Sequence, residues 1–297
     1  MIVVKLMGGL GNQMFQYAAA KRLALYRGTE LKLDLSFFEG IQAGVTRRGY
    51  DLRHLNISAE IASRREIAEL ADRKWNLLQF IPTRFRQIVG LEKRDQNIYS
   101  ERHFDFDPVI LQLPDNTYLN GYWQSEKYFT EIRDILLREF AFKYEQNAKS
   151  REITCQIEKT ESVSLHIRRG DYAHDPLTNK VHGLCSFDYY TNAVNYITQK
   201  KSNCHFYIFS DDHAWVCENF KIDYPFTMVD HNDTSTNYDD LRLMSLCRHN
   251  IIANSAFSWW GAWLNANPEK IVVAPEKWFN DKYLDTKDLI PEAWIKI

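Results

Sequence analysis

The chain has 297 residues, which is enough for two compact α/β halves or for one large α/β unit with a substantial core. Its 37 basic and 39 acidic residues give a net charge of −2, which argues against a nucleic-acid partner held by bulk electrostatics. A hydrophobic content of 45% and a charged content of 26% are typical of a folded protein and exclude a disordered or collagen-like chain.

The five cysteines contain no C-x-x-C pair, so neither a disulfide scaffold nor a zinc knuckle is indicated, and a reducing cytosol is the simplest compartment. The apolar stretch at residues 2–6 is far shorter than the ~20 residues of a membrane span. We therefore expect a protein without a membrane-crossing segment.

The first half opens with the pattern of an α/β unit. An apolar strand, a glycine turn, an amphipathic helix and a second strand are predicted at residues 2–6, 8–11, 13–26 and 31–35. Ser63 and Glu66 then form a candidate capping box, and residues 64–95 indicate helix and loop. A charged stretch at 143–161 marks the junction, which predicts domains at 1–150 and 151–297.

The second half alternates short β-branched or aromatic runs with amphipathic stretches, as in a parallel sheet with crossover helices. Strands are predicted at 163–167, 205–209, 226–229, 250–253 and 270–274. Helices are predicted at 187–200, 213–220, 238–249 and 258–266. The pattern indicates a doubly wound α/β domain.

Polar clusters follow three of these strands, where open α/β sheets bind ligands. Arg168 and Arg169 offer planar donor forks for phosphate oxygens, although a turn with solvated arginines fits this cluster equally well. Ser210 to Asp212 has the chemistry to bind ribose or guanine, but an N-cap of the next helix is the commoner use. Asn254 to Ser258 would place donors at a helix N-terminus, which suits a phosphate.

Aromatic and imidazole side chains near these clusters have a simpler interpretation. Trp259, Trp260 and Trp263 have helical spacing, which favours core packing over a platform for a sugar. His166 lies inside a strand and is expected to pack in the core unless it points into the crevice.

The glycine turn at residues 8–13 (GGLGNQ) matches neither common nucleotide motif, because Met14 replaces the third glycine of the dinucleotide fingerprint and no Gly-Lys-Ser/Thr follows. The turn would let a ligand approach the backbone closely, with Asn12 and Gln13 as amide donors. A purely structural tight turn is the alternative.

Read together, GGLGNQMFQY at 8–17, HIRRGDY at 166–172 and NSAFSWW at 254–260 resemble the inverting α-1,2-fucosyltransferases. The segment GYWQ at 121–124 also resembles a recurring part of that family, whereas residues 42–113 match it weakly. The resemblance implies a GT-B-type fold with two Rossmann-like domains facing a cleft. It also implies transfer of L-fucose from GDP-fucose to the 2-hydroxyl of a terminal galactose on a glycan, with inversion.

The resemblance further implies a set of functional residues. Arg168 would hold the pyrophosphate, Asp171 would shape that site, and Asn12 would lie near the reacting centre. These three are the expected catalytic residues. The residues expected to bind the donor are His166, Arg168, Arg169, Gly9, Gly11, Asp211, Asp212, Asn254, Ser255, Phe257 and Ser258. No metal or other cofactor is expected.

Several points stay open from the sequence. The general base is not identified, and Asp175, Asp34 and Glu39 are candidates. A metal-dependent glycosyltransferase using Asp105 and Asp107, or a carbohydrate-binding protein suggested by the 14% aromatic content, are the rival functions. A bacterial cytoplasmic enzyme of lipopolysaccharide or O-antigen synthesis is expected. The eight basic and five acidic residues at 64–95 leave peripheral contact with the inner membrane open.

Overall fold

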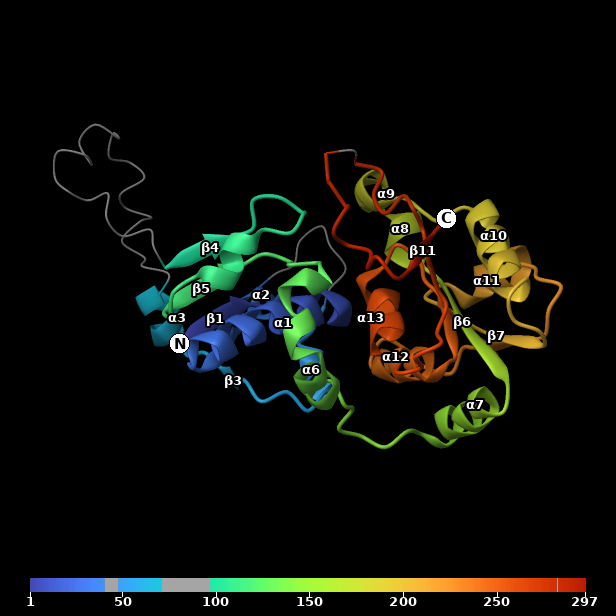
Figure 1. The fold of residues 1–297 in the computed structure, drawn as a ribbon, viewed down its shortest axis with the longest axis horizontal. Helices are drawn as coiled ribbons and strands as arrows, with labels where there is room; N and C mark the ends of the chain where they lie inside the picture. The colour runs from blue at the N-terminus through green and yellow to red at the C-terminus, as the bar shows by residue number, and fades with distance from the viewer. Residues whose placement is uncertain (41–47, 71–96, 282) are drawn as a thin grey trace. The chain divides into compact units, whose positions relative to one another are not determined.

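The computed structural model describes residues 1–40, 48–70, 97–281 and 283–297. Its packing divides the chain into two compact units, and each unit is built on one parallel sheet (Figure 1). The first unit comprises Met1–Arg53 and Ile57–Glu139, and the second comprises His54–Asn56 and Phe140–Ile297. The predicted α/β class with two Rossmann-like halves is confirmed.

The first sheet has the order β3-β2-β1-β5-β4, and all its pairings are parallel. Its strands are β1 (Ile2–Lys5), β2 (Leu31–Asp34), β3 (Glu60–Ile61), β4 (Ile98–Ser100) and β5 (Thr117–Asn120). The strand order reverses between β1 and β5, so the loops that follow these two strands diverge and leave a crevice at the carboxyl edge.

Helix α1 (Leu10–Arg27) follows β1 and is largely buried. It begins three residues before the predicted helix because Gly9 takes an extended conformation as the N-cap, and it ends at Gly28 in the left-handed region with φ 62°. The other helical segments described in this unit are α2 (Ser36–Glu39), α3 (Arg64–Leu70), α6 (Arg133–Glu139), and the 3-10 turns Leu52–His54, at the boundary of the unit, Pro108–Gln112, Glu126–Tyr128 and Thr130–Ile132.

The predicted capping box at the start of α3 is confirmed. The Ser63 backbone N–H donates to Glu66 Oε2 at 2.8 Å, and the Glu66 N–H donates to Ser63 Oγ at 3.2 Å. The predicted helix and loop at 71–95 lie outside the described residues.

The second sheet has the order β11-β10-β9-β6-β7-β8, again with parallel pairings only. Renumbered from β6, this is the 3-2-1-4-5-6 order of dinucleotide-binding folds. Its strands are β6 (Glu161–Ile167), β7 (Cys204–Ser210), β8 (Phe226–Val229), β9 (His249–Ile251), β10 (Val272–Ala274) and β11 (Ile295–Lys296). The strand order reverses between β6 and β9.

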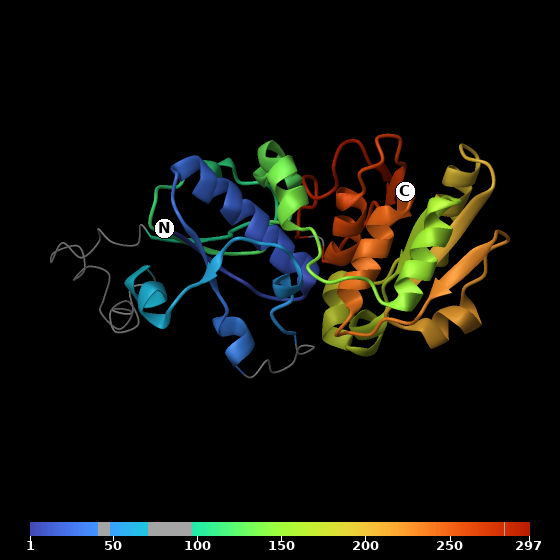
Figure 2. The ribbon, with the colours of Figure 1, turned by 90° about the horizontal axis from the view of Figure 1, so that it is seen from below.

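Helices cover both faces of this sheet (Figures 1 and 2). They are α7 (Ala148–Glu158), α8 (Gly170–His174), α9 (Pro176–His182), α10 (Phe187–Thr198), α11 (His213–Asn219), α12 (Asn237–Leu246) and α13 (Ala256–Leu264). Phe206 and Ile208 of β7 pack toward α10 and α11, whereas Tyr207 and Phe209 pack toward α7 and α12. The alternation follows from the period of two along a strand.

The observed elements differ from the predicted ones both in their bounds and in their number. α12 ends at Leu246 and not at His249, because His249 begins β9. Several elements were not predicted, namely β3, β4, β5, β11, α2, α6, α7, α8 and α9. The expected division at 150 and 151 would cut α7, which packs against β6 and α12. Core packing of the three tryptophans of α13 is confirmed by their near-complete burial. None of the helices described in the structure has the length and apolar character needed to span a membrane.

A buried amide network links the strands on either side of the reversal in the second sheet. Asn250 Nδ2 donates to Ser164 Oγ of β6 and to the Met244 carbonyl of α12, both at 2.8 Å. Asn265 Nδ2, just beyond α13, donates to Asn250 Oδ1 at 2.8 Å. All three side chains that take part are buried, so the network ties together the elements that carry the polar loops.

Replacement of Asn250 by alanine should therefore destabilise the protein. Each buried polar group left without a partner costs about 1–3 kcal/mol. At roughly 2–4 °C per kcal/mol, the melting temperature should fall by at least about 4 °C. Differential scanning calorimetry measures this, with Asn195→Ala on the exposed face of α10 as the control. Equal melting temperatures for the two variants would contradict a structural role for the network.

Candidate active site

The polar loops predicted to form a site come from the carboxyl ends of β6, β7 and β9, and the first two meet around Arg168. Its Nη1 lies 2.7 Å from Asp211 Oδ2, and its Nη2 donates to Asp171 Oδ1. The ring of Tyr172 lies beneath the guanidinium, 5.0 Å from ring centroid to Cζ. Arg168 is thus held from three sides by the β6 and β7 loops.

The protonation states at this cluster follow from burial and charge. Burial opposes the charged form of Arg168, but the carboxylates of Asp211 and Asp171 outweigh it and raise the pKa of Arg168 above its ordinary value. Burial lowers the pKa of His166 to about 4, which keeps its imidazole neutral at pH 7. Within the described residues, His166 Nδ1 and Arg168 Nε are buried without a hydrogen-bond partner. Such unpaired polar atoms are expected where a ligand binds.

Arg169 occupies a different environment from its neighbour. Its Nε lies 3.4 Å from Asp212 Oδ2, and its Cζ lies 3.4 Å from the ring centroid of Trp215, a cation–π contact. Asp212 also caps α11, since its Oδ1 accepts from the Trp215 N–H at 3.3 Å. The Arg169 backbone N–H donates to Asp211 Oδ1 at 2.8 Å. Arg169 therefore supports the junction of the two loops.

Gly170 is required by this arrangement. A Cβ at Gly170 would overlap the carboxylate of Asp211. Only glycine lets Asp211 approach the β6 loop closely enough to reach Arg168.

The third loop, at the start of α13, is held by a helix cap and by buried hydrogen bonds. Ser255 caps the helix by accepting from the Phe257 N–H at 3.3 Å, and the Phe257 ring lies 6.0 Å from that of His166. Ser258 is buried and donates to the Ser255 carbonyl at 3.4 Å. Asn254 is also buried, and its amide donates to the carbonyls of His182, Gly183 and Trp278 at 3.0 to 3.3 Å. Asn254 thus holds neighbouring loops together.

Two aromatic side chains that the sequence did not single out extend the cluster. The imidazole of His182 stacks on the ring of Tyr172, with 4.6 Å between the ring centroids and an angle of 15° between the ring planes. Burial lowers the pKa of His182, and its buried Nδ1 has no partner in the described residues. Their positions depend on the fold of α8 and α9, which the sequence pattern did not reveal.

The glycine turn lies in the first unit, so Gly9, Gly11 and Asn12 belong to the other unit from Arg168. Gly8 takes φ 73°, and a Cβ there would overlap the Asn12 side chain. Asn12 Oδ1 accepts from Gln124 Nε2 at 2.8 Å, which joins the loops after β1 and β5. Gly9 is the N-cap of α1, and Gly11 is buried in its first turn. The turn and the GYWQ segment thus meet where the strand order reverses.

The three carboxylates considered as general bases have other partners. Asp34 is buried and accepts from Tyr118 Oη at 2.5 Å and from the Ser36 N–H at 2.8 Å. Glu39 is exposed and lies 3.1 Å from Arg64. Asp175 caps α9, and hydrogen bonds from the Thr178 hydroxyl and the Leu177 N–H hold its pKa below the usual range. A lowered pKa makes Asp175 a weak base.

The acidic pair of the metal-dependent rival is also engaged locally. Asp107 Oδ1 accepts from the Val109 N–H at 3.0 Å and caps the 3-10 turn that begins at Pro108, and its Oδ2 accepts from Tyr99. In the described ranges, no group of three or more His, Cys, Asp or Glu side chains converges as metal ligands would.

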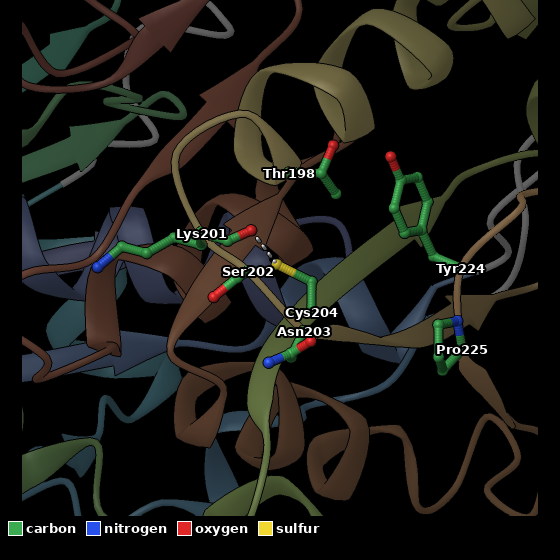
Figure 3. Close-up of a pocket in the computed structure, with 7 residues that line it drawn as sticks. All are labelled: Thr198, Lys201, Ser202, Asn203, Cys204, Tyr224 and Pro225. Carbon is green, nitrogen blue, oxygen red and sulfur yellow. Dashed lines mark hydrogen bonds between the residues drawn. The ribbon is translucent and has the colours of Figure 1, made fainter.

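A surface cavity of about 360 Å³ lies at the other edge of the second sheet (Figure 3). It is lined by Thr198, Lys201, Ser202, Asn203, Cys204, Tyr224 and Pro225. Because Cys204 begins β7 and Ser210 ends it, this cavity is remote from the loops that hold Arg168. The cluster at the carboxyl edge, with its unpaired buried atoms, is the better candidate site.

Comparison with known proteins places the chain in a family of glycosyltransferases. The model of the family described as Glycosyl transferase family 11 matches residues 87–297. An alpha-1,2-colitosyltransferase of Escherichia coli is 35% identical, with 100% of this chain and 98% of the relative covered. The O-antigen biosynthesis glycosyltransferase WbnK of the same species is 34% identical, with 98% and 99% covered. Galactoside alpha-(1,2)-fucosyltransferase 2 of Rattus norvegicus is 23% identical, with 100% and 77% covered.

Among solved structures, an Arabidopsis thaliana FUT1 mutant in complex with GDP matches with a TM-score of 0.52 and 12% identity, covering 91% of this chain and 69% of that one. This likeness concerns the fold and agrees with the predicted GT-B type. Two relatives above 30% identity cover the chain almost completely, and the family model covers more than half of it. The chain therefore belongs to glycosyl transferase family 11 and is a glycosyltransferase.

Proposed function

We propose that this glycosyltransferase transfers L-fucose from GDP-fucose to the 2-hydroxyl of a terminal galactose on a glycan, with inversion at the anomeric carbon. The observation that carries the proposal is the guanidinium of Arg168, held between Asp171 and Asp211 at the strand reversal of the second sheet. That reversal is where doubly wound sheets bind nucleotides. The three sequence motifs that resemble α-1,2-fucosyltransferases support the choice of donor and acceptor.

The chemistry needed for this transfer matches the residues of the second unit. Charge develops on the diphosphate as the bond to the sugar breaks, and fixed donors stabilise it best. Among the residues that the structure describes, neither Arg168 Nε nor His166 Nδ1 has a hydrogen-bond partner. The N-terminus of α13, capped by Ser255, adds backbone N–H groups and the positive end of the helix dipole. Asp171 accepts from Arg168, so its role is to orient the guanidinium.

The acceptor is expected to meet the first unit. We place Asn12 beside the reacting sugar or the acceptor, because Gly8 opens the backbone there and Gln124 fixes the amide of Asn12. The carbohydrate-binding rival would not account for an arginine paired with two carboxylates at the carboxyl edge of the second sheet. A cytoplasmic site of action, with or without contact to the inner membrane, stays a prediction.

The direct test is a product assay with GDP-fucose and a panel of galactosides, with linkage determined by NMR. We expect α-1,2-fucosylated galactose as the product. Binding is tested separately: GDP should raise the melting temperature more than UDP does. Equal shifts in melting temperature with GDP and UDP would contradict the proposed preference for guanine.

A second sugar nucleotide should be tested as the donor in that assay. The colitosyltransferase relative shares the 1,2 linkage and is more similar to this chain than the fucosyltransferase relative. The corresponding GDP-linked colitose should be offered beside GDP-fucose. Faster transfer of colitose would replace fucose in the proposal and leave the site unchanged.

Arg168→Lys should abolish most of the activity while the protein still folds. A guanidinium donates in a planar fork to two carboxylates and to a phosphate, whereas an ammonium is a compact, strongly hydrated charge. Loss of one such preorganised contact typically costs about 10²- to 10³-fold in kcat. We expect a loss of at least roughly a hundredfold on that basis, with only modestly weaker donor binding, measured by steady-state kinetics.

Two matched Arg→Lys variants serve as controls. Arg169→Lys should be milder, because a lysine can still pair with Asp212 and contact Trp215. Arg138→Lys, at an exposed position in the first unit, should be neutral. Retention of most of the kcat by Arg168→Lys, or a larger loss at Arg169, would refute the role assigned to Arg168.

We expect the transfer reaction to proceed without a metal ion. The proposed site stabilises the diphosphate with Arg168 and helix dipoles, so a divalent cation has no assigned role. EDTA should leave the transfer rate unchanged, and added Mg²⁺ or Mn²⁺ should not raise it. Abolition of turnover by EDTA together with recovery on adding either metal would overturn this mechanism.

A further inference from the structure

The carboxyl edge of the first sheet carries a segment whose position depends on one buried amide. Gln13 Nε2 donates to the Gly8 carbonyl at 2.9 Å and to the Gly49 carbonyl at 2.8 Å. Gln13 Oε1 accepts from the N–H groups of Asp51 at 2.8 Å and Leu52 at 3.3 Å. Gln13 is fully buried, so residues 49–52 are fixed against the glycine turn that holds Asn12.

The described carboxylates near this edge include Asp34, Glu39, Glu101 and Asp51, and the first three have partners. Asp34 and Glu39 are engaged as described above, by Tyr118 and by Arg64. Glu101 follows β4, and its two oxygens accept from the backbone N–H groups of Tyr122 and Trp123 at 2.7 and 2.9 Å. Glu101 therefore fixes the GYWQ segment. The fourth carboxylate is Asp51.

The carboxylate of Asp51 is half-buried, and the structure gives it no hydrogen bond or ion pair within the described residues. Burial raises the pKa of Asp51, and the charges of Arg53 and Arg48 oppose this shift only in part. A raised pKa brings a carboxylate closer to the operating pH and makes it a better proton acceptor. Asp51 thus lies beside the glycine turn, has a carboxylate with no partner among the described residues, and has a raised pKa.

We propose that Asp51 is the general base for the acceptor, an inference that rests on the proposed function. The acceptor hydroxyl oxygen forms the new bond to the anomeric carbon, and its proton passes to the Asp51 carboxylate. The bond from that carbon to the diphosphate breaks, and its electron pair leaves with GDP. Atoms and charge balance without any further reactant.

The test compares four proteins: the wild type, Asp51→Asn, Asp51→Ala and the exposed control Asp134→Asn. Asp51→Asn should lower kcat for transfer by about 10²- to 10⁴-fold, the usual contribution of a positioned base. GDP should still raise its melting temperature as in the wild type, because donor binding does not involve the base. Asp134→Asn should match the wild type in both measurements.

Two readouts separate a chemical role from a structural one. The wild-type kcat should fall at acidic pH with an apparent pKa above that of an ordinary aspartate, and Asp51→Asn should lose this limb. Formate, a small carboxylate, should restore turnover to Asp51→Ala. An acidic limb that persists in Asp51→Asn, kcat close to that of the wild type, or no rescue by formate would overturn the assignment.

The experiments test the assignment of Asp51 and the proposed function separately. Absence of transfer by the wild type would reject the proposed function, and the assignment of Asp51 with it. Wild-type transfer combined with full activity of Asp51→Asn would reject the assignment of Asp51 alone.

Discussion

The guanidinium of Arg168, on a side chain that is 18% exposed, depends on the two carboxylates that hold it. Removing a charge from water is costly unless it is paired and hydrogen-bonded, and Asp171 and Asp211 meet that requirement from different loops. The pairing in turn explains Gly170, since any side chain there would displace Asp211. The β6 and β7 loops therefore form one rigid element, and Arg169 strengthens it through Asp212.

The charge of this element bears on the proposed binding of a diphosphate. Asp171, Asp211 and Asp212 carry three negative charges against the two positive charges of Arg168 and Arg169, a formal sum of −1. On the proposed function, a diphosphate would draw stabilisation from Arg168 and from the N–H groups at the start of α13. Fixed donors of this kind need no reorganisation at the moment of reaction, which is what makes them effective in catalysis.

Both units place their distinctive residues at the same topological point. In the second unit the loops after β6 and β9 meet, and the rings of His166 and Phe257 lie 6.0 Å apart. In the first unit the loops after β1 and β5 meet, and Asn12 bonds to Gln124. Ligands commonly bind where the connections of parallel strands diverge at their carboxyl ends, and polar side chains lie at that point in each unit.

The sequence by itself determined the α/β class, five of the strands and four of the helices of the second unit, and the motifs that lie at strand ends, because hydrophobic periodicity and glycine turns are local signals. Only the tertiary structure showed that Asn254 donates hydrogen bonds to neighbouring loops, that Arg169 packs on the ring of Trp215, and that Asp51 lies beside the glycine turn. These contacts join residues from about 40 to about 70 positions apart in the chain, and no local pattern encodes such distances. Burial and pairing, which decide what each polar side chain can do, arise only when those segments pack together.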